Sequence, residues 1–293
     1  MTVFTMKLAA MLSMLIDHAT FVLDMRGLVG VHTYQALRGV GRIAFPIFCF
    51  LIVNGLELSS DRRGYISRLA LFAAISQVPY SMVFTRSNYR VEQGAVGFDL
   101  SLGMALSLLL LMTAALCAVW YFTVRRDRSA LYLAPALLLG FTRLEYMGRV
   151  FLSSELDVFY TLALGLAAIC LLDDALERRD KRWYILLLQL AALSAAVYFY
   201  GRHSDYSYTG IALILLLYLC RSSRVLQAVA LCLWSGYAYW YRLNSVRFAL
   251  FACLAVIPIL LYDGEPGRRA KWGFYAFYPL HLAALGILNI VIK

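Results

Sequence analysis

The stretch Met6-Lys7-Leu8-Ala9-Ala10-Met11-Leu12-Ser13-Met14-Leu15-Ile16-Asp17-His18-Ala19 decides the fold of this chain. A lysine lies near its start, and an adjacent aspartate and histidine lie in its second half. The segment is otherwise apolar for about 20 residues, long enough for a helix to cross a hydrocarbon core of ~30 Å. An ionisable group at that depth is costly, so it normally faces the protein interior and has a partner or a function there.

The spacing of Lys7 and His18 predicts that both project from one face of this helix. They are eleven residues apart, which is roughly three turns and about 16 Å along the axis. Asp17 is rotated by about 100° from His18, so these two side chains are poorly placed to serve each other. We therefore expect the group that orients the His18 ring to come from another helix.

The composition indicates a membrane protein with several spans. Of the 293 residues, 62% are hydrophobic and 15% are charged, and the mean hydropathy is +0.72. A soluble domain with such a surface would aggregate, and the apolar runs are too long and continuous for barrel strands. We predict an all-α fold, a polytopic helical bundle, with residues 1–293 as a single transmembrane domain.

About eleven apolar segments (10–11) can be counted, of which the fifth is short. They are centred near residues 15, 47, 75, 111, 137, 167, 191, 214, 232, 254 and 282. The second and third contain Pro46 and Pro79 at a similar depth. Each proline removes one helical hydrogen bond and so predicts a bend, either beside a cavity or at an ordinary packing kink.

The basic residues behind the net charge of +10 lie mainly in short loops. This pattern orients a membrane protein and argues against nucleic acid as a partner. The even-numbered loops hold 15 basic residues: Arg62, Arg63, Arg68, Arg125, Arg126, Arg128, Arg178, Arg179, Lys181, Arg182, Arg221, Arg224, Arg268, Arg269 and Lys271. The odd-numbered loops hold nine: Arg26, Arg38, Arg86, Arg90, Arg143, Arg149, Arg202, Arg242 and Arg247. This excess predicts cytoplasmic even loops, a cytoplasmic N-terminus and an external C-terminus.

Polar motifs open or interrupt three of the later segments. Glu155–Thr161 opens the sixth, His203–Gly210 opens the eighth, and Trp272–His281 lies in the last. His281 is about 15 Å along its helix from the inner end, so His18 and His281 are expected at comparable depth. Two mid-membrane histidines with external carboxylates and an internal cationic edge suggest a path through the protein.

The residues alone leave the class of function open. The sequence has no G-x-S-x-G, no phosphate-binding glycine loop and no metal-ligand spacing, so no metal cofactor is expected. A proton-coupled transporter with a buried Asp/His relay explains the ionisable residues equally well. The absence of an evident internal repeat argues against an inverted-repeat transporter, and a purely structural subunit would leave the buried charges without a purpose.

Six motifs, spread from the first segment to the last, resemble the TraX family. They are M-L-I-D-H at 14–18, G-R-I-A-F-P-I-F at 41–48, I-S-Q-V-P-Y at 75–80, L-D-V-F-Y-T-L-A-L-G at 156–165, D-Y-S-Y-T-G at 205–210 and K-W-x-F-Y-x-F-Y-P-L-H at 271–281. Two features depart from the family pattern. Asn54 stands where a glutamate is expected, and an extra stretch from about Arg90 to Glu155 adds two spans.

The resemblance implies an acetyl-CoA-dependent acetyltransferase in the inner (plasma) membrane of a bacterial cell. The founding member of the family acetylates the N-terminal amine of conjugative pilin. The family is grouped with transmembrane acyltransferases that pass an acyl group from cytoplasmic acyl-CoA to an acceptor outside. In the related acyltransferase-3 family, a basic residue followed eleven positions later by a histidine marks the first span, as Lys7 and His18 do here. The implied acceptor is a peptide N-terminus, an amino sugar or another small amine or hydroxyl.

The same resemblance implies roles for five candidate catalytic residues. His18 is the base, because histidine titrates near neutral pH and its neutral ring is the cheaper form in a membrane; the alternative is a histidine bonded to a neighbouring helix. Asp17 is either a helix–helix anchor or a site carboxylate. Asp157 and Asp205 hold the acceptor amine, orient a histidine, or are ordinary helix N-terminal carboxylates. His281 is a second base, a group along the pantetheine channel, or a packing residue beside a proline kink.

On the inner side, the resemblance implies a binding site for the co-substrate acetyl-CoA. Lys7, Arg42 and Arg68 are candidates for its phosphates through charge-assisted hydrogen bonds, although Arg68 also fits simple positive-inside anchoring. Tyr278 and Lys271 complete the predicted donor site. The lipid bilayer is the remaining expected partner.

Overall fold

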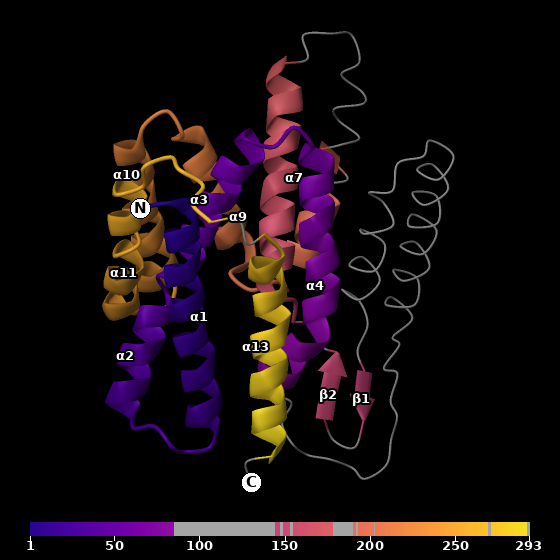
Figure 1. Ribbon diagram of the computed structural model, residues 1–293, viewed down its shortest axis with the longest axis vertical. Coiled ribbons are helices and arrows are strands. Elements are labelled where there is room, and N and C mark those ends of the chain that lie inside the picture. The colour runs from indigo at the N-terminus through magenta and orange to yellow at the C-terminus, as the bar shows by residue number, and fades with distance from the viewer. Residues whose placement is uncertain are drawn as a thin grey trace. The chain divides into compact units, whose positions relative to one another are not determined.

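The computed structural model describes residues 1–84, 144–146, 149–152, 155–177, 190–191, 193–201, 203–268 and 271–291 (Figure 1). The chain folds into two units. The first combines Met1–Leu58 with Thr209–Lys293, and the second is Ser59–Tyr208.

The first unit is a helical bundle that begins with the segment containing Lys7 and His18. Its elements are α1 (Val3–Met25), α2 (Val31–Gly41), α3 (Ala44–Glu57), α9 (Ser207–Leu219), α10 (Arg224–Ser235), the π-helix η2 (Gly236–Tyr241), α11 (Val246–Cys253), α12 (Val256–Leu260) and α13 (Lys271–Val291). Large apolar side chains from five of these helices fill its core: Met6, Ile47, Phe50, Leu56, Leu213, Ile214, Leu217, Leu231 and Ile259.

Helices α1 and α13 lie side by side and run in the same direction (Figure 1). Near their beginnings, the amide of Val3 donates to the carbonyl of Glu265 (2.9 Å). Near their ends, Nε of Arg26 donates to Oδ1 of Asn289 (3.1 Å). Because the two helices are joined at both ends, residues on their facing sides can meet along the whole length.

The second apolar segment is a helix with a break. Helix α2 ends at Gly41, and α3 begins two residues later with Pro46 in its first turn, where a proline has no amide hydrogen to donate back across the break. Ser13 of α1 donates its hydroxyl to the carbonyl of Val40 beside the break (2.7 Å). The helix is therefore interrupted shortly before Pro46, and α1 supplies a hydrogen bond to the backbone beside the break.

The amino terminus and the predicted loops 8 and 10 lie at one end of this unit. The amide of Asp263 donates to the carbonyl of Met1 (3.1 Å), and Arg221 pairs with Glu57 at the end of α3 (2.7 Å). The Asp263 carboxylate accepts from the amide of Glu265 (2.9 Å). This hydrogen bond is the main cause that lowers the pKa of Asp263, and the neighbouring amino terminus lowers it further.

The opposite end holds loops that the charge pattern assigns to the other side. Arg247, at the start of α11, donates to Oε1 of Gln35 in α2 (2.5 Å). The loop after α1 and the end of α13 are joined there by Arg26 and Asn289. The loop after α1 and the start of α11 therefore lie at the same end of this unit.

The second unit contains two antiparallel helices, α4 (Arg62–Phe84) and α7 (Val158–Glu177), together with the π-helix η1 (Val197–Gly201). Arg62 at the start of α4 pairs with Asp173 near the end of α7 (2.6 Å). Pro79 lies inside α4 and does not end it.

The prediction of a helical fold is confirmed, and one short β-hairpin accompanies the helices. Strands β1 (Leu144–Tyr146) and β2 (Arg149–Leu152) pair antiparallel. Their sequence, L-E-Y-M-G-R-V-F-L, alternates polar with apolar or aromatic residues at its start and has a glycine between the strands, which favours a hairpin over a helix. The fold of the described chain is otherwise predominantly α-helical.

Three described stretches are helical, long and apolar enough to cross a membrane: Val3–Met25, Val31–Glu57 and Arg62–Phe84. Shorter apolar helices cover Val158–Asp173, Ser207–Leu219 and Val246–Leu260. The segments predicted near residues 111 and 137 lie outside the described residues. These helices support the prediction of a membrane protein.

Candidate functional site

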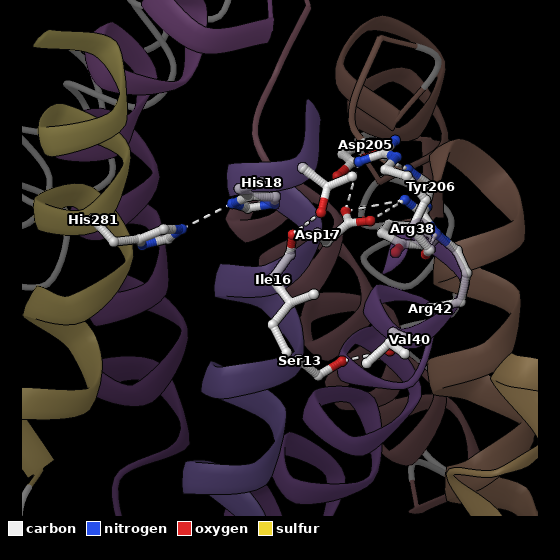
Figure 2. Close-up of polar contacts among 11 residues, drawn as sticks. Ser13, Ile16, Asp17, His18, Arg38, Val40, Arg42, Asp205, Tyr206 and His281 are labelled. Carbon is white, nitrogen blue, oxygen red and sulfur yellow. Dashed lines mark hydrogen bonds and ion pairs between the residues drawn. The ribbon is translucent and has the colours of Figure 1, made fainter. Parts of the chain in front are cut away.

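Asp17 and His18 point in different directions from α1 (Figure 2). His18 faces α13, where it meets His281, whereas Asp17 faces the end of α2. The predicted rotation of about 100° between adjacent helical residues therefore separates two polar contacts on two neighbouring helices.

The two histidines form a direct, buried contact. Nδ1 of His18 lies 2.8 Å from Nε2 of His281, and both residues are 8% exposed. Nδ1 of His281 lies in turn 2.8 Å from the carbonyl oxygen of Phe277, one turn earlier in α13. The prediction that His18 and His281 lie at comparable depth is confirmed, and the expected partner from another helix is His281.

Two aromatic rings of α13 pack against this histidine pair. Phe277 stacks on His281 with ring centroids 4.6 Å apart. The buried Tyr278 meets both imidazoles edge-on, at 6.2 Å from His18 and 5.5 Å from His281. Hydrogen bonds in such buried surroundings are electrostatically stronger than in water. Tyr278, predicted for the donor site, thus lies next to the histidines.

Lys7 lies on the face of α1 that carries His18, as predicted. Its Nζ is 4.8 Å from the ring centroid of Phe274 in α13, and Phe4 packs edge-on against the same ring at 5.7 Å. Phe274 and His281 are seven residues apart, two turns along one face of α13. The α1–α13 contact therefore carries a cation near one end and the histidine pair about 16 Å further along.

Two arginines at the end of α2 hold Asp17. Nη1 of Arg38 lies 2.8 Å from Oδ2, and Nη2 of Arg42 contacts both carboxylate oxygens at 2.9 and 3.0 Å. Nε of Arg42 donates to the carbonyl of Arg38 (3.2 Å). The three side chains are 10% to 18% exposed, so this is a largely buried cluster of two cations and one anion. Its geometry fits the helix–helix anchor among the two interpretations of Asp17.

Glycines allow α2 to approach its neighbours this closely. A Cβ at Gly41 would lie 2.2 Å from Cβ and 2.4 Å from Cγ of Asp17, and one at Gly39 would lie 2.4 Å from the ring of Phe251 in α11. A side chain at Gly41 would therefore push the Asp17 carboxylate away from the arginines.

In the second unit, a buried polar cluster forms at the start of α7. Asp157 is 0% exposed, and its Oδ1 accepts from the amide of Phe159 (2.8 Å). Gln77 of α4 donates to the carbonyl of Glu155 (2.7 Å) and accepts from the amide of Asp157 (3.2 Å). The Gln-Val-Pro motif of the third segment thus contacts the motif that opens the sixth.

Thr161 and Ser204 extend this cluster to the motif that opens the eighth segment. Their hydroxyl oxygens are 3.0 Å apart, and Thr161 donates to the carbonyl of Asp205. The backbone of Leu156 exchanges hydrogen bonds with His203 and Asp205, at 2.8 and 2.9 Å. Motifs from three separate segments therefore meet in the second unit, while the histidine pair belongs to the first.

The predicted donor residues have different surroundings. Arg42 directs its donors to Asp17 and to the backbone, and Arg68 lies on α4 in the second unit. Lys271 begins α13, but its side chain lies outside the described residues. Of the five, the structure brings Lys7 and Tyr278 to the α1–α13 contact.

A family model described as TraX protein matches residues 3–146 and 141–289. The chain belongs to the TraX family. A relative from Dichelobacter nodosus, named probable fimbrial assembly protein FimC, serogroup H1, is 25% identical over 296 residues, which cover 96% of this chain and 93% of the relative. No solved structure matches the chain. The resemblance drawn from six short motifs is thus confirmed at the level of the family.

One residue that binds Asp17 was not among the predicted site residues. Arg38 was counted only as a loop charge, yet it binds Asp17 together with Arg42. The four-residue spacing of Arg38 and Arg42 indicates this role, because residues four apart share a helix face and a buried carboxylate needs a cation. Among the described residues, no group of three His, Cys, Asp or Glu side chains is arranged to hold a metal.

Proposed function

We propose that this TraX-family protein is a membrane acetyltransferase. It moves an acetyl group from cytoplasmic acetyl-CoA to an amine or hydroxyl of an acceptor outside, with His18 as the general base. The observation that carries the proposal is the buried His18–His281 pair, on the same helix face as Lys7. A neutral, buried imidazole is suited to proton abstraction near neutral pH.

The chemistry is an acyl transfer that needs one proton acceptor. The acceptor amine attacks the carbonyl carbon of the thioester while His18 removes its proton. The C–S bond then breaks, an amide C–N bond has formed, and the departing CoA thiolate takes the proton from His18. A base of this kind typically contributes about 10²–10⁴-fold in rate.

Lys7 is the better placed of the predicted phosphate ligands. It lies in the first turns of α1, at the end that holds the amino terminus and Arg221. The pantetheine arm of acetyl-CoA is long and thin, and about 16 Å along α1 separates Lys7 from His18. In this proposal, the phosphates bind near Lys7 and the thioester reaches the histidine pair.

The proposed topology has eleven spans, with the N-terminus in the cytoplasm and the C-terminus outside the plasma membrane. Two findings support it. The parallel course of α1 and α13 requires an odd number of crossings from the first to the last. The end that holds the amino terminus also holds loops 8 and 10, which belong to the basic set.

A peptide N-terminal amine is the first acceptor to test. The Dichelobacter nodosus relative is named a probable fimbrial assembly protein, and fimbriae are built from protein subunits. An amino sugar or another small amine or hydroxyl is the alternative acceptor.

The direct test uses purified protein, labelled acetyl-CoA and a short peptide with a free amino terminus. We expect saturable acetyl-CoA binding by calorimetry and label transfer to the peptide. His18→Ala should abolish transfer and leave binding largely intact, because the base acts mainly in the transition state. The matched control is His32→Ala, which changes an exposed histidine of α2. Full transfer by His18→Ala would refute the proposed role of this residue.

A proton-coupled transporter is the second candidate. The buried cluster of Asp17 with Arg38 and Arg42 favours it, since such groups mark ion and proton paths in membranes. A transporter predicts no affinity for acetyl-CoA, so the same calorimetric measurement separates the two candidates.

A further inference from the structure

The hydrogen bonds around the two histidines have a fixed direction. The carbonyl oxygen of Phe277 can only accept, so Nδ1 of His281 must carry the proton that it donates across 2.8 Å. A neutral imidazole carries one N–H, so Nε2 of His281 is then an acceptor. The nitrogen that faces it at 2.8 Å is Nδ1 of His18, which must therefore be the donor.

We infer that His281 is a positioning residue that holds His18 as its Nδ1–H tautomer. In that tautomer the lone pair lies on Nε2 of His18, which is the nitrogen that accepts the proton of the attacking amine. The use of this lone pair rests on the proposed acetyl transfer. The tautomer itself follows from the backbone carbonyl of α13.

Burial favours the neutral state that this argument needs. Both histidines are 8% exposed. Tyr278 contacts both rings, and Phe277 stacks on His281. A charged imidazolium at such depth is costly, and so is a carboxylate in the orienting position. A second histidine anchored on a backbone carbonyl orients the first ring and adds no charge to the resting state.

The same contact serves the step that follows. When Nε2 of His18 takes the proton of the amine, the ring becomes an imidazolium and its Nδ1–H becomes a stronger donor. Nε2 of His281 accepts that charge-assisted hydrogen bond. The proton then leaves from Nε2 to the CoA thiolate, and both rings return to their starting tautomers.

The tautomer can be measured directly. The chain has four histidines, so ¹⁵N-histidine labelling gives few resonances, and loss of one in each variant assigns them. We expect His18 in the wild type to be protonated at Nδ1. His281→Gln should keep this state, since its amide oxygen can accept the same hydrogen bond, whereas His281→Leu should lose it. His203→Gln, at an exposed position, is the matched control and should leave the His18 signals unchanged.

Activity supplies the second readout. We expect His281→Leu to lower kcat by at least about 100-fold with little change in acetyl-CoA binding, because loss of a tautomer-fixing partner lowers the turnover of a serine protease by about 10⁴-fold. His281→Gln should stay within about tenfold of the wild type. A His18 protonated at Nε2 in the wild type, or full activity in His281→Leu, would overturn the inference. If His18 is protonated at Nδ1 but the protein transfers no acetyl group, the inferred tautomer stands and the proposed function is rejected.

Discussion

At the scale of single residues, Asp17 is a buried carboxylate paired with two arginines. Asp17→Asn would leave Arg38 and Arg42 largely buried without a counter-ion. Removal of one partner from a buried pair costs roughly 3–5 kcal/mol. We expect Asp17→Asn to lower the free energy of unfolding by about that amount, measured by denaturant unfolding in detergent.

A matched control is available in the same unit. The pair of Arg221 with Glu57 has side chains that are 42% and 36% exposed, and such pairs contribute only about 0–1 kcal/mol. Glu57→Gln should therefore have little effect on unfolding. Equal losses for Glu57→Gln and Asp17→Asn would contradict the anchoring role of Asp17.

Replacement of Lys7 tests the proposed binding site for acetyl-CoA. Lys7→Gln should raise the KM for acetyl-CoA, or its Kd, at least about tenfold, which corresponds to a charge-assisted contact of roughly 1.5–3 kcal/mol. Arg247→Gln removes a cation at the other end of the same unit and should leave the donor affinity unchanged. If Lys7→Gln binds acetyl-CoA like the wild type, its contact with Phe274 is structural.

At the scale of elements, the close approach of α2 to α1 depends on the absence of a side chain at Gly41. Gly41→Ala places a Cβ 2.2 Å from Asp17 Cβ, so the helices must separate and the ion pairs with Arg38 and Arg42 lengthen. We expect a clear loss of thermal stability. Gly273→Ala, in the first turn of α13 with nothing within 4 Å of the new Cβ, is the control, and it should be neutral or slightly stabilising. Equal stability of the two variants would show that the helices separate at no cost.

At the scale of the whole molecule, the property to test is which end of the first unit faces the outside of the cell. Single cysteines at Ser222 and Glu265 lie at the end of the first unit that holds the amino terminus, and one at Asn244 lies at the other end. In a background without the six native cysteines, a membrane-impermeant thiol reagent should label only Asn244→Cys in intact cells. Labelling of Glu265→Cys in intact cells would reverse the proposed orientation.

The sequence by itself determined the helical membrane character, the family and the facing of Lys7 and His18. It also placed His18 and His281 at comparable depth. These properties depend on segment length, helical periodicity and distance along a helix, all of which are local.

Only the tertiary structure decided which groups meet. Periodicity does not specify how each helix is rotated against its neighbours, so the Nδ1 partner of His18 was left open between carboxylates and other groups, and it is His281. For the same reason, the arginines that bind Asp17 and the contact of Gln77 with Asp157 emerged only from packing. The proton position on His18 follows from a backbone carbonyl of another helix, because a tautomer is set by the partner that packing provides.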